Sequence, residues 1–196
     1  FTTQAVLANG EVQGDFDFAK AIDGKYAVVF FYPLDFTFVC PSEILAMANR
    51  TEKLKALGCE VVGISVDSHW THNAWRNTEV SKGGIGAVPL TLAADMSRSI
   101  SESYGIISDS DDDFYPNGVS MRATFVIDQE GFVRHQVVND EPLGRNMDDV
   151  VRVVEAWQFF KENGQVCPAG WNKGDAGMTT SPEGVAEYLS EHGEKL

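Results

Sequence analysis

The chain has 196 residues, of which 43% are hydrophobic and 22% are charged, a composition typical of a globular protein with one core. Its formal net charge of −14 disfavours binding to nucleic acids and to anionic membrane surfaces. No apolar run reaches the roughly 20 residues that cross a bilayer, and the first residues lack the basic and apolar parts of a signal peptide, so we expect neither a span nor a leader.

Four short segments have the pattern of β-strands. Three are continuous apolar runs, which are typical of strands buried on both faces of a central sheet. The fourth alternates apolar and polar residues, which predicts a half-exposed strand joined to the third by a hairpin. In chain order these segments are 26–31, 61–66, 123–128 and 132–138.

Helices are predicted between these strands. Apolar residues at helical spacing indicate a helix over 42–57, which Gly58 ends. Ser68 and Asp95 are suited to cap two further helices, and Asn146 precedes a longer one. The apolar face of that last helix comprises Met147, Val150, Val151, Val154 and Trp157.

The predicted strands alternate with helices along the chain, which favours an α/β fold with crossover connections. Beyond Gly164, prolines and glycines interrupt any regular element. We therefore expect a main domain over 1–164 and a C-terminal arm over 165–196, with a short helix near 182–190.

The chain has three cysteines, Cys40, Cys59 and Cys167. A secreted disulfide scaffold usually has more cysteines and an even number of them. These three cysteines are typical of a reducing compartment, and we expect a cytoplasmic protein. Cys59 precedes a buried strand and is interpreted as a core residue.

Cys40 lies where a strand and loop give way to a helix. Pro41 supports that boundary, because proline is favoured at the first helical position. The positive end of the helix dipole and its free N–H groups favour the thiolate, which is the nucleophilic form. Thr37, three residues earlier, could present its hydroxyl to the same pocket. On these residues alone, Cys40 could also be a small buried hydrophobic residue.

The segment 33–41, PLDFTFVCP, resembles the P-x-x-x-T-x-x-C motif around the peroxidatic cysteine of peroxiredoxins. The segment 166–171, VCPAGW, is similar to the resolving-cysteine motif of the typical two-cysteine subgroup, and the segments 138–140 and 144–145 also match that subgroup. The resemblance runs from the first strands into the arm. It implies a thioredoxin-like fold with a mixed central sheet flanked by helices.

The resemblance also implies the roles of the residues near Cys40. Cys40 would be the peroxidatic cysteine, Pro33 would shield the pocket from water, and Thr37 would hydrogen-bond the peroxide. Arg122, at the start of a predicted buried strand, would stabilise the thiolate and the charge that develops as the O–O bond breaks. The alternative role for Arg122 is a surface ion pair without a catalytic function.

The resemblance also implies which residues orient Arg122 and how the oxidised Cys40 is returned to the thiol. Glu43 and Arg145 would orient Arg122. The sulfenic acid formed on Cys40 would condense with Cys167 of a partner chain, which implies a homodimer and often a ring of five dimers. Thioredoxin or a flavoprotein disulfide reductase would restore the thiols, and no cofactor or metal is expected.

Two segments depart from the family pattern. Family members that are sensitive to over-oxidation carry a GGLG segment and a C-terminal YF pair. At the corresponding positions this chain has a GGIG segment at 83–86 and a YL segment, Tyr188-Leu189. We expect intermediate to high sensitivity to over-oxidation. The segment 108–118 is longer and more acidic than is usual. Asp109, Asp111 and Asp113 imitate a calcium loop, but Phe114 and Ser120 stand where that loop needs Gly and Glu, so a solvated loop is expected.

Other classes of protein fit the sequence less well. His69 and His72 could bind a metal, but no cysteine pair joins them at ligand spacing, and we expect exposed helix residues. A Cys–His hydrolase would leave Thr37 and Arg122 without a role. A thioredoxin-like dithiol enzyme needs C-x-x-C, and Glu43 stands at the second cysteine position. A holdase chaperone or a peroxide-sensing relay could coexist with catalysis.

Overall fold

The structure is a computed structural model, which describes residues 1–110 and 116–195. The chain forms two compact units, Phe1–Met147 and Asp148–Leu196. Within the described residues, none of the helices has both the length and the apolar composition of a membrane span.

The first unit is built around a seven-stranded mixed sheet with the strand order β2-β1-β5-β4-β3-β6-β7. The central strands β3, β4 and β5 run parallel, whereas β1, β6 and β7 pair antiparallel with their neighbours. The strands are β1 (Thr2–Val6), β2 (Val12–Asp17), β3 (Tyr26–Phe31), β4 (Cys59–Ser65), β5 (Thr91–Ala94), β6 (Arg122–Ile127) and β7 (Val133–Asn139).

The four strands expected from the sequence are all present. β3 has the predicted bounds, β4 begins two residues early at Cys59, and β6 and β7 form the expected antiparallel hairpin. Three other strands were not expected. β1 and β2 are short and largely polar, and β5 has four residues, so none of them carries a clear periodic signal.

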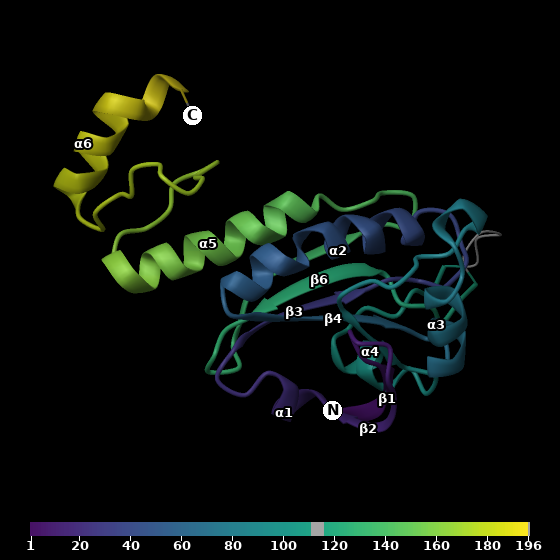
Figure 1. Ribbon diagram of the computed structural model, residues 1–196. Helices are drawn as coiled ribbons and strands as arrows, with labels where there is room; N and C mark the ends of the chain where they lie inside the picture. Colours follow the sequence, from purple (N-terminus) through teal and green to yellow (C-terminus); the bar gives the residue numbers. More distant parts are fainter. Residues whose placement is uncertain (111–115, 196) are drawn as a thin grey trace. The chain divides into compact units, whose positions relative to one another are not determined.

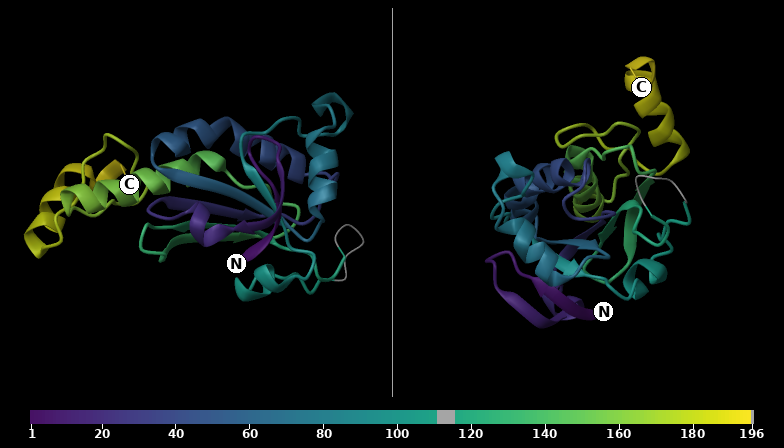
Figure 2. Two further views of the ribbon diagram at one scale, coloured as in Figure 1. Left: turned by 60° about the horizontal axis from the view of Figure 1, so that its bottom comes forward. Right: turned by 90° about the vertical axis from the view of Figure 1, so that its right-hand side faces the viewer.

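Helices cover both faces of this sheet. α2 (Cys40–Ala56) lies above the sheet in Figure 1, and α4 (Ser99–Ser103) lies below it. The same layering is visible after rotation (Figure 2). α1 (Phe18–Ala21) contributes Phe18 to the core on the α4 side. α3 (His69–Arg76) and the 3-10 turn Val80–Lys82 complete the unit.

The helix caps follow the sequence in one case and depart from it in another. Ser68 caps α3 as expected, because its hydroxyl accepts a hydrogen bond from the N–H of Thr71 at 3.1 Å. Asp95 was expected to cap a helix directly, with its end near Tyr104-Gly105. Its carboxylate instead accepts from the N–H groups of Ile100 and Ser101, so α4 begins only at Ser99.

The second unit contains α5 (Met147–Asn163), whose first residue closes the first unit, and α6 (Pro182–His192), followed by a 3-10 turn over Gly193–Lys195. The arm predicted from residue 165 lies within this unit. An isolated bridge between Val166 and Met178 closes a loop between the helices. The rings of Trp171 and Phe159 pack with their centroids 4.9 Å apart, which fixes that loop on α5.

Candidate active site

Cys40 is the first residue of α2, and its side chain is fully buried. The loop that follows β3 delivers the chain to this point, and Pro41 occupies the first turn of the helix. Val39 at the N-cap provides no side-chain hydrogen bond to the first N–H groups. The Cys40 sulfur therefore lies at the positive end of the helix dipole, where a negative charge is favoured.

Two side chains of the first unit reach the sulfur of Cys40, one from the preceding loop and one from the start of β6. The hydroxyl of Thr37 lies 3.1 Å from Sγ, and a guanidinium nitrogen of Arg122 lies 3.3 Å from it. The Thr37 hydroxyl is also 2.7 Å from the carbonyl oxygen of Leu34. Because a hydroxyl has one hydrogen, it can donate to Leu34 or to a sulfur anion, but not to both.

Arg122 is held by an ion-pair network inside the protein. Glu43 accepts a hydrogen bond from Arg122 at 2.8 Å and three from Arg145, at 2.8 to 2.9 Å. All three side chains are buried, Arg122 completely. Burial alone would raise the pKa of Glu43, but the hydrogen bonds and charge of Arg145, together with the charge of Arg122, bring that pKa below its usual value.

The other predicted residues fall in different settings. Pro33 is buried at the start of the loop that leads to Cys40. Cys59 is buried at the start of β4, as expected for a core residue, and burial raises its pKa to about 12. Cys167 belongs to the second unit, where its thiol lies 3.4 Å from the carbonyl oxygen of Ala156. Burial raises the pKa of Cys167, although the charge of Arg152 opposes this.

A buried polar cluster behind the Cys40 loop was not predicted. His72 was expected to be exposed, but its side chain is fully buried, and Nδ1 lies 2.7 Å from the carboxylate of Asp35. Tyr32 donates to the same carboxylate at 2.8 Å, and Asp67 accepts from the N–H of Asp35 at 2.8 Å. Burial and the charge of Asp35 raise the pKa values of Tyr32 and Asp67. These residues lie in the loop after β3, the loop after β4 and helix α3, and no sequence motif joins them.

The GGIG segment packs tightly against the end of α3. The carbonyl oxygen of Gly83 accepts a hydrogen bond from the indole of Trp75 at 2.9 Å. A Cβ atom added to Gly84 would lie 2.0 Å from the carbonyl oxygen of Thr78, so no larger residue fits there without movement of the backbone.

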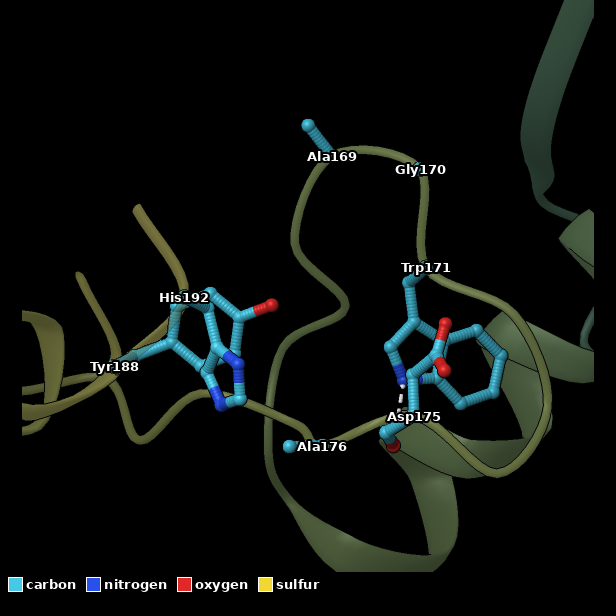
Figure 3. Close-up of a pocket in the computed structure, with 7 residues that line it drawn as sticks. All are labelled: Ala169, Gly170, Trp171, Asp175, Ala176, Tyr188 and His192. Carbon is cyan, nitrogen blue, oxygen red and sulfur yellow. Dashed lines mark hydrogen bonds between the residues drawn. The ribbon is translucent and has the colours of Figure 1, made fainter. Parts of the chain in front are cut away.

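The YL segment lies on α6 of the second unit. The ring of Tyr188 packs on that of His192 at a centroid distance of 4.6 Å. Both rings border a cavity of about 420 Å³ whose other wall is the loop around Trp171 (Figure 3). The indole nitrogen of Trp171 donates to the carbonyl oxygen of Asp175 at 3.1 Å, which fixes the shape of this loop.

The acidic segment 108–118 begins and ends in a hydrogen-bonded stem. Ser108 and Gly118 are joined by a backbone hydrogen bond of 2.9 Å. Three of the residues compared with a calcium loop, Asp111, Asp113 and Phe114, lie outside the described residues. Within residues 1–110 and 116–195, no group of three or more His, Cys, Asp or Glu side chains is placed to hold a metal ion.

Comparisons with known proteins agree with one another. Residues 3–136 match the AhpC/TSA family, and residues 156–191, which include Cys167, match the C-terminal domain of 1-Cys peroxiredoxin. The chain is 46% identical over 196 residues to alkyl hydroperoxide reductase C of Helicobacter pylori, covering 100% of this chain and 96% of that protein. It is 46% identical to peroxiredoxin-2 of Cricetulus griseus, covering 98% and 92% of the two chains.

A solved structure extends the agreement to the fold. The reduced 2-Cys peroxiredoxin of Plasmodium vivax superimposes with a TM-score of 0.90 and 42% sequence identity, covering 97% of this chain and 94% of that one. The expected thioredoxin-like α/β fold is confirmed. The chain belongs to the AhpC/TSA family and is a peroxiredoxin, a thiol-dependent peroxidase that acts on hydroperoxides.

Proposed function

We propose that Cys40 is the peroxidatic cysteine and that Thr37 and Arg122 act directly on its substrate. The observation that carries the proposal is the convergence of two side-chain donors, the Thr37 hydroxyl and the Arg122 guanidinium, on one buried sulfur at the N-terminus of α2. Cys59 lies in the same unit without this environment, and its raised pKa keeps it a thiol.

The reaction begins with attack of the Cys40 thiolate on the hydroxyl oxygen of the hydroperoxide. The S–O bond forms as the O–O bond breaks, and the electron pair leaves with the other oxygen, which takes a proton and departs as water or alcohol. Cys40 is thereby oxidised to a sulfenic acid. Arg122 and Thr37 donate toward the oxygens that gain charge, which lowers the barrier. Glu43 and Arg145 hold Arg122 in place, and Pro33 limits the access of water.

Cys167 of a partner chain resolves the sulfenic acid in this proposal. Its sulfur attacks Sγ of Cys40, a disulfide forms, and the sulfenic hydroxyl leaves as water with the proton of the thiol. The two-cysteine relatives and the placement of Cys167 in a loop of the second unit support this step. A dithiol donor, either thioredoxin or a flavoprotein disulfide reductase, then reduces the disulfide. These three free thiols suit the cytoplasm.

A homodimer, assembled further into a ring of five dimers, is proposed as the working form. β7 is an edge strand of the sheet and exposes Val133 and Val138. Such an edge is a ready template for pairing with a second copy. Phe36, Phe38 and Trp70 form further exposed apolar surface in the first unit, which supports additional contacts between copies.

Over-oxidation should reach Cys40 at moderate peroxide excess. In the family, GGLG and YF segments delay unfolding of the active-site helix, and the tight packing of Gly84 on Thr78 suits the same role here. The lifetime of the Cys40 sulfenic acid would then be long enough for a second peroxide molecule to oxidise it to the sulfinic acid. Intact mass spectrometry measures this product. A Cys40 that stays free of sulfinic acid at peroxide excesses that inactivate sensitive homologues would contradict the expectation.

Peroxide consumption by wild type and two variants tests the proposed function. Cys40→Ser should abolish turnover of hydrogen peroxide supported by a dithiol donor, whereas Cys59→Ser should retain it, because the buried Cys59 thiol remains protonated. Any holdase chaperone activity should persist in Cys40→Ser, whereas peroxidase activity should be lost. This one variant therefore distinguishes a chaperone role from catalysis. Equal turnover in Cys40→Ser and wild type would remove the proposal.

A further inference from the structure

The guanidinium of Arg122 is held on two of its edges. One nitrogen faces Cys40 and Glu43, as described above, and Nε donates to the main-chain carbonyl oxygen of Glu141 at 2.5 Å. A planar guanidinium fixed at Nε and at a terminal nitrogen cannot rotate away from the sulfur. The position of the Glu141 carbonyl therefore affects where the guanidinium of Arg122 lies relative to the sulfur of Cys40.

The direction of this carbonyl is not set by the sheet. Glu141 lies two residues beyond the end of β7, in a turn. Its side chain is nevertheless buried, and Oε1 accepts a hydrogen bond from the hydroxyl of Ser108 at 3.2 Å. The backbone N–H of Glu141 also donates to the carboxylate of Asp140 at 2.8 Å. A buried carboxylate bound at its far end restrains the main chain to which it is attached.

The position of Ser108 is fixed by backbone hydrogen bonds. The residue is buried, its N–H donates to the carbonyl oxygen of Val119 at 2.8 Å, and its carbonyl accepts from the N–H of Gly118 at 2.9 Å. These bonds form the stem of the acidic segment 108–118. The stem is thus linked through the Glu141 side chain and carbonyl to the guanidinium at Cys40.

We propose that Glu141 and Ser108 are positioning residues for the peroxidase reaction. Ser108 holds the carboxylate of Glu141, and Glu141 in turn aims its carbonyl at Nε of Arg122. Neither side chain touches the substrate. The inference rests on the proposed roles of Cys40 and Arg122, and it assigns a catalytic consequence to the stem of the acidic segment.

The test compares Ser108→Ala, Glu141→Ala and Glu141→Gln with Ser103→Ala, which deletes a hydroxyl bonded to Ile100 on α4. The second-order rate constant for Cys40 oxidation by hydrogen peroxide is measured in the full chain by rapid mixing. We expect Ser108→Ala and Glu141→Ala to lower it by about three- to tenfold, the size of effect that the loss of one ordinary hydrogen bond implies. Glu141→Gln keeps an acceptor oxygen for Ser108 and should stay within about twofold of wild type.

A second readout separates positioning from stability. The pH profile of Cys40 alkylation by iodoacetamide should shift its midpoint upward in Ser108→Ala and Glu141→Ala, because a displaced guanidinium stabilises the thiolate less. Rates and profiles equal to those of Ser103→Ala would overturn the inference, as would lower thermal stability with an unchanged profile. A wild-type Cys40 that does not react with peroxide would instead defeat the proposed function on which the inference rests.

Discussion

Replacing Arg122 by alanine is expected to lower the second-order rate constant for oxidation of Cys40 by about 100- to 1000-fold. The guanidinium lies 3.3 Å from the sulfur in a fully buried setting, where a charge-stabilising donor has its largest effect. Removal of one such preorganised donor costs catalysis on this scale in other enzymes. Stopped-flow measurement of Cys40 oxidation by hydrogen peroxide gives the rate constant directly.

Two comparison variants sharpen this result. Arg122→Lys keeps the charge but cannot bind Cys40, Glu43 and the Glu141 carbonyl at once, so we expect it to recover only a small part of the rate. Arg134→Ala removes a partly exposed arginine paired with Asp128 at the β-hairpin, and its rate should match wild type. An Arg122→Ala variant within threefold of Arg134→Ala would contradict the role given to Arg122.

Replacing Glu43 by glutamine should cost about 3–5 kcal/mol of the free energy of unfolding, because two buried guanidinium groups lose their shared carboxylate. The pKa of Glu43 is lower in the folded protein than its ordinary value of 4.5. Its ionised form therefore stabilises the folded state above that value, and this contribution is lost as the pH falls through the lowered pKa. Denaturant unfolding between neutral pH and pH 3 measures both effects.

Glu52→Gln is the matched control on the same helix. Glu52 is exposed and pairs with Lys55 at 3.3 Å, so its loss should change stability by at most about 1 kcal/mol. The acid-dependent component of stability should be smaller in Glu43→Gln than in Glu52→Gln. Equal stability of the two variants at neutral pH would show that the buried network does not hold the site together.

The sequence was most informative where one short segment carries the chemistry. Cys40, Pro41 and Thr37 lie within five residues of one another, so a helix start and a facing hydroxyl could be read from their spacing. Arg122 is 82 residues from Cys40, and only the family resemblance pointed to it before the contact was seen. The same is true of Arg145, which is 102 residues from Glu43.

Features that depend on tertiary pairing were missed for a physical reason. β1, β2 and β5 are stabilised by their neighbours in the sheet rather than by their own propensity, so short polar or small-residue segments became strands. His72 was expected to be an exposed residue of a helix. It is buried because Asp35, 37 residues away, supplies a partner for the ring nitrogen. Ser108 and Glu141 carry no motif at all.

If Cys40 and Cys167 of two chains form one redox pair, peroxide should join two chains through a disulfide. The reduced protein is treated with one equivalent of hydrogen peroxide and run on a non-reducing gel beside Cys40→Ser, Cys167→Ser and the control Cys59→Ser. We predict a band at dimer mass for wild type and Cys59→Ser, and monomer bands for the other two variants. A wild-type chain that stays at monomer mass, with Cys40 unmodified by mass spectrometry, would contradict the account and leave Cys40 a buried core residue.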